Sequence, residues 1–435
     1  MTASLRVVVV NYNGGGEVLT GLRSLLTAHW DGPREVVVVD NGSVDGSLER
    51  IVAQLPEVRV VRSPGNLGYP AINQVVTDLG GVDVVAVVNP DAVVAPDCLQ
   101  LLAEVLDADP GLGAACPLIL LDGDYREITL SLDGPARASL ELLGVEGADR
   151  WHLTGPRVRR RWHGGVAWTV GDGSMLRSTA ASGRPVRLRV RAHHPGQVVL
   201  RSGDAETTWR VGRRPAVIEV AIGGDARPVV QNAGSVIARY GVGENRGYHQ
   251  LDGASFGQPT DVPAWCGAAV LLRAAYLRDV GLFDERWFLY YEDTDLAWRG
   301  LLRGWRYAFV PEARVRHAHS TSIGHGSALY DVQHERNRLL TVTKLAPATE
   351  MRATWADALA RVGQQVRADV LARVRDRRLP ELVLTGRRLR ALAAALRLTP
   401  DVVRDRRAVR AGATVADQHL PVLGRWQDPS QAQEP

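Results

Sequence analysis

Three polar clusters near the start of the chain each come directly after a short, continuous run of apolar residues. Hard cations such as Mg²⁺ and Mn²⁺ bind few carboxylates and leave positions for phosphate oxygens. One carboxylate of such a group can therefore hold a metal ion with its diphosphate, while another accepts hydrogen bonds from a ribose or a nucleobase. The alternative is that the acids are turn residues, because Asp-Asn-Gly and Asn-Pro-Asp are strong turn formers. The clusters are Asn11-Tyr12-Asn13, Asp40-Asn41 and Asn89-Pro90-Asp91.

A second acidic cluster, Glu292-Asp293-Thr294-Asp295, lies among aromatic residues. Carboxylates beside aromatic surface tend toward raised pKa values and useful basicity. On a helix, Glu292 and Asp295 lie on one side and Asp293 is offset from them. Acids at a helix N-terminus also complement the helix dipole, which explains one or two of them but not the aromatic surroundings. We predict a catalytic role for Asp293 and Glu292. The aromatic neighbours are Trp287, Phe288, Tyr290, Tyr291 and Trp298.

Two further segments carry residues suited to metal or phosphate. His317 and His319 follow an expected strand at 307–310 and a Pro-Glu-Ala turn. An imidazole there can bind a metal or contact a diphosphate, and the alternative is a surface or capping histidine. We favour His317 over His319. Arg336-Asn337-Arg338 is expected at the head of a helix, where guanidinium groups suit phosphate oxygens, or else on a solvated basic face.

The elements that position these residues alternate along the first 120 residues. Strands buried on both faces and separated by helices predict a mostly parallel, doubly wound α/β sheet. Ligands of such sheets bind at the carboxyl ends of the strands, where the three polar clusters converge. The expected strands are Leu5–Val10, Glu35–Val39, Val58–Arg62 and Val82–Val88, and the expected helices are Val18–Leu26, Leu48–Leu55 and Pro70–Leu79.

The pattern of expected elements changes after residue 134. Pro185–Ala192 alternates strictly between apolar residues and arginines, and three further strands follow at hairpin spacing, which predicts an antiparallel β insert. The basic stretch Arg157–His163 before them is expected to be a loop. We place domain boundaries at 1–134 (first half of the α/β region), 135–228 (insert), 229–345 (second half of the α/β region), 346–412 (basic helices) and 413–435 (tail).

The composition is that of a globular protein: 435 residues, 45% hydrophobic and 23% charged, which excludes disorder, collagen and a coiled-coil rod. Three scattered cysteines, Cys98, Cys116 and Cys266, exclude a disulfide framework or a zinc cluster and favour a reducing cytoplasm, with the cysteines in the core. The N-terminus lacks the pattern of a signal peptide, and no apolar run is long enough for a spanning helix.

The net charge of +4 is unevenly distributed. Residues 335–410 hold 18 basic and 8 acidic side chains, a net of +10, which leaves −6 for the rest. This region also has helical periodicity, as in a basic amphipathic helix that lies on an anionic membrane. The alternative is a helical pair packed on the core with a solvated basic rim. We therefore expect a cytoplasmic protein, peripheral at the inner face of the plasma membrane in the first case.

Seven segments in collinear order carry a resemblance to a known family. They lie within residues 5–120 and 229–345, and their order makes them more specific than any single motif. The series resembles the family 2 inverting glycosyltransferases of GT-A fold, and most of all the rhamnosyltransferase-like branch that builds bacterial cell-surface glycans. The segments read VVVVNYNGG, EVVVVDNGSVDGS, PGNLGYPAINQ, VVNPDAVVAPDCL, WCGAAVLLR, VGLFDERWFLYYEDTDLAWR and VPEARVRHAHSTS.

The resemblance implies a GT-A, doubly wound, Rossmann-like mixed sheet, with the β insert and the C-terminal helical region added to it. It implies a metal-dependent hexosyltransferase that uses Mg²⁺ or Mn²⁺. Such an enzyme moves a sugar, rhamnose or similar, from a nucleotide-diphosphate-sugar to a glycan acceptor in cell-wall or surface polysaccharide biosynthesis. A lipid-linked glycan fits the basic C-terminal region. Nucleic acid is not an expected partner, and the sequence leaves the oligomeric state and the role of the insert open.

The resemblance also assigns roles to single residues. Asp293 is the expected base with Glu292 beside it, and Asp91 is the expected metal ligand, with His317 completing the metal or diphosphate site. The common Asp-x-Asp is Asn89-Pro90-Asp91 here, which leaves a single carboxylate for the metal. The expected nucleotide-sugar site comprises Asn11, Tyr12, Asn13, Asp40, Asn41, Asn66, Asn89 and Trp265.

Two other functions are compatible with parts of the pattern. A sugar-1-phosphate nucleotidyltransferase would carry a glycine-rich loop with basic residues after its first strand, and Asn11-Tyr12-Asn13-Gly14 has no basic residue. A catalytically inactive sugar- or partner-binding protein would not need Glu292-Asp293 and Asp91, which are intact. Hydrolysis of nucleotide-sugar without acceptor distinguishes an enzyme from a binding protein.

Overall fold

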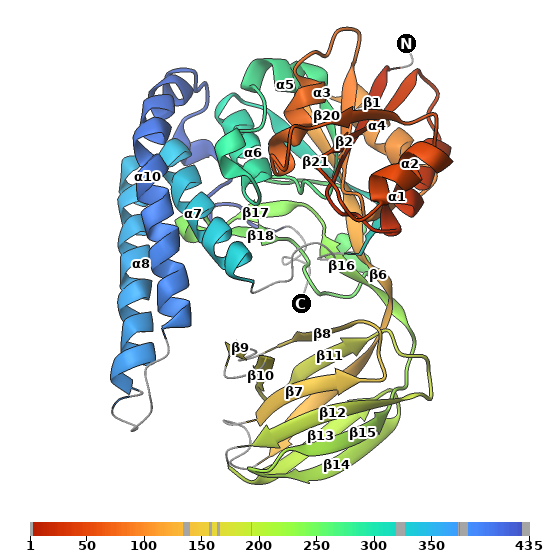
Figure 1. Ribbon diagram of the computed structural model, residues 1–435, viewed down its shortest axis with the longest axis vertical. Helices are drawn as coiled ribbons and strands as arrows, with labels where there is room; N and C mark the ends of the chain where they lie inside the picture. Colours follow the sequence, from red (N-terminus) through yellow and green to blue (C-terminus); the bar gives the residue numbers. More distant parts are fainter. Residues whose placement is uncertain are drawn as a thin grey trace. The chain divides into compact units, whose positions relative to one another are not determined.

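The computed structural model describes residues 3–133, 140–155, 159–162, 166–192, 194–318, 327–372, 374 and 382–428 (Figure 1). The chain forms two compact units. Unit 1 comprises 1–120, 231–248 and 253–435, and unit 2 comprises 121–230 and 249–252. The sequence places the corresponding boundaries at 134/135 and 228/229, whereas β6 (Leu112–Asp133) runs without a break from unit 1 into unit 2.

Unit 1 is built on a mixed sheet whose four N-terminal strands are parallel, in the order β3-β2-β1-β4. Valine-rich runs form these strands because β-branched side chains pack well on both buried faces. The next strands, β20 (Ala269–Arg273) and the start of β6, run antiparallel. The parallel strands are β1 (Leu5–Asn11), β2 (Arg34–Asp40), β3 (Arg59–Arg62) and β4 (Val84–Val88).

Helices and 3-10 turns connect the strands of this sheet. The expected helix at 70–79 is instead a 3-10 turn, η1 (Tyr69–Ile72), followed by the single helical turn α3 (Asn73–Val76). The others are α1 (Glu17–Thr27), α2 (Ser47–Gln54), α4 (Cys98–Ala108), α5 (Ala274–Val280) and α6 (Glu292–Leu302), with the 3-10 turns η3 (Arg239–Gly241), η4 (Ala254–Phe256), η5 (Glu285–Trp287) and η7 (Asp417–His419).

A long strand, β21 (Arg306–His317), pairs antiparallel with β5 (Ala92–Val94) and β19 (Thr260–Asp261). The prediction of a Pro-Glu-Ala turn was wrong, because Pro311 and its neighbours stay within this strand. Pairing of His317 with Ala92 places His317 beside the Asn-Pro-Asp turn. A short hairpin, β17 (Ser235–Ile237) and β18 (Gly243–Asn245), completes the strands of this unit.

The C-terminal region of unit 1 is helical, as predicted. α7 (Ala328–Leu345), α8 (Ala348–Val366) with its π-helical continuation (Arg367–Ala372), and α10 (Val383–Ala411) share a buried core. Ser327 caps α7 by accepting a 3.1 Å hydrogen bond from the Tyr330 N–H. The helix therefore begins well before Arg336-Asn337-Arg338, and our placement of these residues at its head was wrong.

Unit 2 consists of two antiparallel sheets around one apolar core. The strict alternation of Pro185–Ala192 is confirmed, since Val186, Leu188 and Val190 are buried while Arg187 and Arg189 are exposed. The predicted loop at 157–163 was wrong where β9 (Arg159–Trp162) forms, and its remaining residues lie outside the described ones.

The strand orders of unit 2 are β14-β13-β6-β11-β8 and β15-β12-β7-β10-β9, and β16 also pairs with β6. The bounds are β7 (Leu140–Glu146), β8 (Trp151–Thr154), β10 (Val166–Val170), β11 (Ser174–Ser178), β12 (Pro185–Ala192), β13 (Gly196–Ser202), β14 (Ala205–Val211), β15 (Ala216–Ala221) and β16 (Arg227–Asn232). The predicted fold class is thus confirmed: a mixed α/β sheet, an antiparallel β insert and a C-terminal helical region.

Candidate active site

The ends of β1 and β2 meet in a buried hydrogen-bond network. Asn11 and Asp40 lie opposite each other in the strand register, and the Asn11 Nδ2 donates to Asp40 Oδ1 at 2.9 Å. The same amide donates to Ser43 and Ser47 hydroxyls, while Asp40 Oδ2 accepts from the N–H groups of Gly42 and Ser43. Both side chains are almost fully buried, so they hold the loops of this edge in place.

Tyr12 and three asparagines, of which Asn41 is buried, continue the same edge. The Tyr12 ring is 42% exposed, so it is open to a planar ligand such as a nucleobase. Asn13 has φ +53° and accepts a 2.8 Å hydrogen bond from the Val44 N–H. Asn41 Nδ2 donates to the Gly68 carbonyl at 2.8 Å, and Asn66 Oδ1 accepts from the Gly68 N–H at 2.9 Å. Sequence-predicted residues from three loops are thereby tied together.

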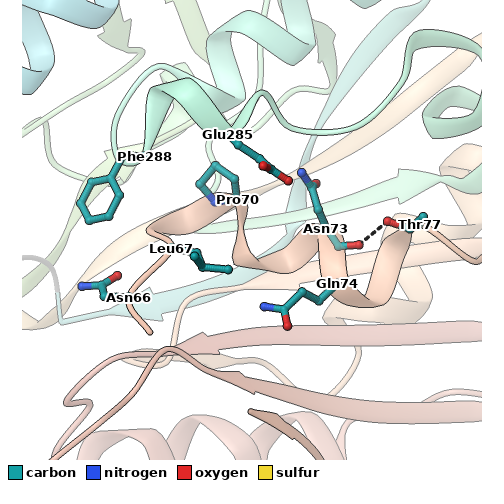
Figure 2. Close-up of a pocket in the computed structure, with 8 residues that line it drawn as sticks. All are labelled: Asn66, Leu67, Pro70, Asn73, Gln74, Thr77, Glu285 and Phe288. Carbon is teal, nitrogen blue, oxygen red and sulfur yellow. Dashed lines mark hydrogen bonds between the residues drawn. The ribbon is translucent and has the colours of Figure 1, made fainter. Parts of the chain in front are cut away.

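A pocket of about 490 Å³ lies between η1–α3 and the loop that precedes α6 (Figure 2). Its walls combine amides, a hydroxyl and a carboxylate with one aromatic ring, which are groups that hydrogen-bond and stack on polar ring ligands. Of the sequence-predicted residues, Asn66 alone lines it. The lining residues are Asn66, Leu67, Pro70, Asn73, Gln74, Thr77, Glu285 and Phe288.

Asp91 and His317 come together from strands that are far apart in sequence. His317 Nε2 lies 2.9 Å from Asp91 Oδ1 and 3.3 Å from Asn89 Nδ2. Its other ring nitrogen, Nδ1, lies 2.7 Å from Gln231 Oε1. A partner on the second nitrogen fixes the orientation of an imidazole, as in metal-ligating histidines. Sequence reasoning missed Gln231, which has no motif signal and reaches the site only through the fold.

The carboxylate of Asp91 and the imidazole of His317 fit a divalent cation whose remaining coordination positions are filled by a bound ligand. His317 Nε2 and Asp91 Oδ1 lie 2.9 Å apart, so an imidazole nitrogen and a carboxylate oxygen would both be available to hold one cation. Among the described residues no group of three His, Cys, Asp or Glu side chains is close enough to form a protein-only metal site. Two protein ligands leave positions for diphosphate and water oxygens.

Asp293 and Glu292 begin α6, as the sequence indicated, but their surroundings differ. Asp293 Oδ2 accepts a 3.0 Å hydrogen bond from the Gly267 N–H, and Oδ1 accepts from the N–H and hydroxyl of Thr294. Burial raises the pKa of Asp293, and these hydrogen bonds oppose the rise. Glu292 is 5% exposed, its Oε2 has no hydrogen-bond partner, and burial with the nearby Asp293 raises its pKa well above the usual range. The pair therefore divides into a hydrogen-bonded carboxylate and a carboxyl that favours its neutral form.

The turn that leads into α6 has an unusual backbone. Phe288, Tyr290 and Tyr291 all have positive φ values, between +51° and +70°. Such conformations are costly outside glycine and persist only where the surroundings hold them. Gly68 packs directly on this turn, since a Cβ there would lie 2.0 Å from the Phe288 carbonyl oxygen.

Helix α7 holds this turn through Arg336 and Asn337. Asn337 Nδ2 donates to the carbonyls of Trp287, Leu289 and Tyr290 at 2.7–2.9 Å, and Arg336 Nη2 donates to those of Arg286 and Trp287. Arg338 is buried and donates to the Tyr240 carbonyl and to Glu335. The segment 336–338 is therefore neither a phosphate site nor a solvated basic face, and both of our interpretations were wrong.

A buried ion network completes the support of α6. Lys344 is the single lysine of the chain, and its Nζ lies 2.7 Å from Asp284 and 2.8 Å from Asp295. Asp295 is fully buried and also accepts from Arg299 at 2.8 Å. Asn337 and Lys344 lie seven positions apart on α7 and so face the same side of the helix. The lone lysine was the sequence signal for this network, but residue type alone does not name its partners.

The remaining expectations concern Trp265, Cys266 and His319. Trp265 is 1% exposed and packs edge-on against Phe283, so its indole belongs to the core and not to an open ligand surface. Cys266 has a pKa raised to about 12 by burial, which disfavours a thiolate nucleophile. His319 lies outside the described residues.

Part of this site lies within a segment that matches a known protein family. Residues 6–181 match the family model described as Glycosyl transferase family 2. The chain contains a glycosyltransferase family 2 domain. It is also 26% identical over 349 residues to the N-acetylglucosaminyl-diphospho-decaprenol L-rhamnosyltransferase of Mycobacterium tuberculosis, covering 78% of this chain and 83% of that protein. The resemblance read from the sequence motifs is confirmed.

Solved structures of glycosyltransferases are also similar, though more distantly. GalNAc-T7 with UDP, GalNAc and Mn²⁺ aligns at 12% identity with a TM-score of 0.47, over 97% of this chain and 58% of that chain. A mannosyltransferase from Pyrobaculum calidifontis in complex with GDP-Man and Mn²⁺ aligns at 14% identity with a TM-score of 0.39, over 96% and 88%. Both TM-scores are below 0.5, so we draw no conclusion about the function of this chain from these two structures.

Proposed function

We propose that this glycosyltransferase moves a deoxyhexose or hexose, with L-rhamnose as the first candidate, from a nucleotide-diphosphate-sugar to a lipid-linked glycan acceptor, with inversion at the anomeric carbon. The observation that carries the proposal is that the strand-end clusters, which lie within the family 2 match at residues 6–181, and the Glu292–Asp293 pair belong to the same compact unit. The relative from M. tuberculosis, whose name specifies rhamnose and a decaprenol-linked acceptor, supports the choice of donor and acceptor.

Asp293 is the residue best placed to act as the base. In an inverting transfer, a carboxylate takes the proton from the acceptor hydroxyl as that oxygen attacks the anomeric carbon. The hydrogen bonds from Gly267 and Thr294 favour the ionised form and fix the direction of its oxygens. Glu292, which favours its neutral form, can donate a hydrogen bond to the acceptor sugar. A single displacement inverts the configuration, so no enzyme nucleophile is needed.

The donor would lie along the edge formed by β1, β2 and β4. Tyr12 is open for stacking on the base, and Asn41 with Asn66 positions the loop beside it. Asp91 and His317 would hold Mn²⁺ or Mg²⁺ with the diphosphate. The bound cation would neutralise the charge that develops on the leaving diphosphate. Gln231 contacts the other ring nitrogen of His317 and keeps the ring in place for that role.

A donor screen tests the proposal. Purified protein is incubated with nucleotide-sugars and Mn²⁺ or Mg²⁺, thermal shifts identify the donor, and the product on a polyprenol-linked N-acetylglucosamine acceptor gives the linkage and anomer. We expect a shift with one nucleotide-sugar class, and transfer that chelation with EDTA abolishes or strongly reduces. Full activity in chelator would remove the metal role of Asp91 and His317, and a product with retained configuration would exclude the direct displacement.

A further inference from the structure

Helix α10 carries an exposed apolar row that no other part of the described chain covers. Leu389, Leu396 and Val403 are 50%, 60% and 40% exposed. Leu382, just before the helix, is 56% exposed and continues the row at the same seven-residue spacing. Exposed aliphatic side chains scattered singly need no explanation, but a row along one helix face marks an interaction surface.

The face of α10 next to this row is already packed against the neighbouring helices. Leu392, Ala395 and Val402 are buried in the core shared with α7 and α8, and Arg406 donates to the Thr343 carbonyl at 2.9 Å. Figure 1 shows α8 and α10 running side by side. The exposed row is therefore an apolar strip at the margin of the face that attaches the helix to unit 1, and it stays open.

Arginines repeat beside this row with the same period. Arg390, Arg397 and Arg404 each follow a residue of the row directly, and all are exposed. Among the described residues, only Arg404 of the three has an ion pair, with Asp401 at 3.4 Å and with both side chains more than half exposed. Residues 348–411 contain 15 arginines and 7 acidic residues. Long arginine side chains can lie along apolar surface while their charged ends reach polar groups.

A second copy of the chain is a poor occupant for this row. A coiled-coil seam needs a second apolar row at the complementary heptad positions. Those positions hold Gly386, Ala393, Pro400 and Arg407. Flanking arginines would also face one another in an antiparallel pair, and like charges at these positions are destabilising. A single apolar row with positive flanks fits a flat, negatively charged, partly apolar surface instead.

We propose that the exposed face of α10 docks on an anionic lipid surface, with Leu389, Leu396 and Val403 entering the interface and Arg390, Arg397 and Arg404 reaching the lipid phosphates. The exposed Leu359 and Val366 of α8 provide further apolar contacts. In the described residues no helix is long and apolar enough to cross a membrane, so this contact is a surface one. The proposed function gives this docking its purpose, which is to keep the active site near a lipid-linked acceptor. The docking itself does not depend on that function.

Vesicle sedimentation with the full-length protein tests the proposal. Phosphatidylcholine vesicles are compared with vesicles that also contain phosphatidylglycerol. We expect binding to the anionic vesicles that weakens with salt, and little binding to the neutral ones. The double variants Leu389→Gln/Leu396→Gln and Arg390→Gln/Arg397→Gln should each weaken binding by about tenfold or more. A control with the same charge change on exposed residues of unit 2, Arg189→Gln/Arg214→Gln, should bind like the wild type.

The outcomes separate the occupants. Absence of wild-type binding to anionic vesicles overturns the proposal, and so does binding by either double variant that equals that of the wild type. Self-association that Leu389→Gln/Leu396→Gln abolishes, without vesicle binding, assigns the row to a second copy of the chain. Thermal unfolding of each variant confirms that it is folded, since all four residues are exposed. Transfer to a soluble acceptor analogue should stay unchanged in the variants. If no acceptor is glycosylated while vesicle binding holds, the proposed function fails and the docking surface stands.

Discussion

At the scale of single residues, Asp293 and Glu292 have different tasks although they are neighbours. Replacing Asp293 removes the group that would accept the proton. It leaves the proposed nucleotide-sugar site at the edge formed by β1, β2 and β4 unchanged. We expect Asp293→Asn to keep nucleotide-sugar binding, measured by thermal shift, and to lose at least about 10²-fold in turnover. A variant with normal turnover would show that another group takes the proton.

The raised pKa of Glu292 predicts how stability depends on pH. The folded protein holds this proton to a higher pH than the unfolded chain, whose glutamate has a pKa of 4.5. Unfolding therefore releases a proton between the two pKa values, and the free energy of unfolding falls as pH rises through that range, by up to about 1.4 kcal/mol per pH unit. Glu292→Gln removes this dependence. The Tm of the variant minus that of the wild type should increase from pH 4.5 upward, and a constant difference would contradict the assignment.

At the scale of elements, α7 is the support of the catalytic turn. Asn337 donates to three carbonyls of a backbone that would otherwise relax from its positive φ values. Asn337→Asp replaces these donors with an acceptor that repels the carbonyls. We expect kcat to fall roughly 10- to 100-fold with little change in the KM for donor, because the turn positions the base and not the nucleotide.

The matched control for Asn337→Asp is Gln364→Glu, the same amide-to-carboxylate change at an exposed position of α8. It should leave kcat unchanged. The stability of both variants is measured in parallel by thermal unfolding. A fall in stability for Asn337→Asp with unchanged kcat would make Asn337 a purely structural residue and would separate the turn from catalysis.

At the scale of the whole molecule, the two units have separate apolar cores. The proposed donor site lies entirely in unit 1. Scanning calorimetry should resolve two unfolding transitions, and donor with Mn²⁺ should raise only the one that belongs to unit 1. At a ligand concentration of about 100 times Kd, the stabilisation is about 2.7 kcal/mol. A single transition that shifts as a whole would show that the units unfold together.

Local patterns in the sequence were sufficient for the strands, the β insert and the acidic pair. Runs of valine ended by Asn11, Asp40 and Asn89, and an acidic cluster among aromatics, depend only on neighbours along the chain. The same local rules failed at Pro311, because pairing with β19 before it and with β5 after it keeps the backbone extended through a residue that usually ends a strand.

Contacts between distant segments were decided only by the tertiary structure. The strand register brings His317 to Asp91 and Gln231, and helix packing turns Asn337 and Lys344 toward the catalytic turn. A polar side chain on a helix looks the same in sequence whether it faces water, a phosphate or a buried carbonyl. The difference lies in desolvation, which depends on what the fold places around the side chain and not on its neighbours in the chain.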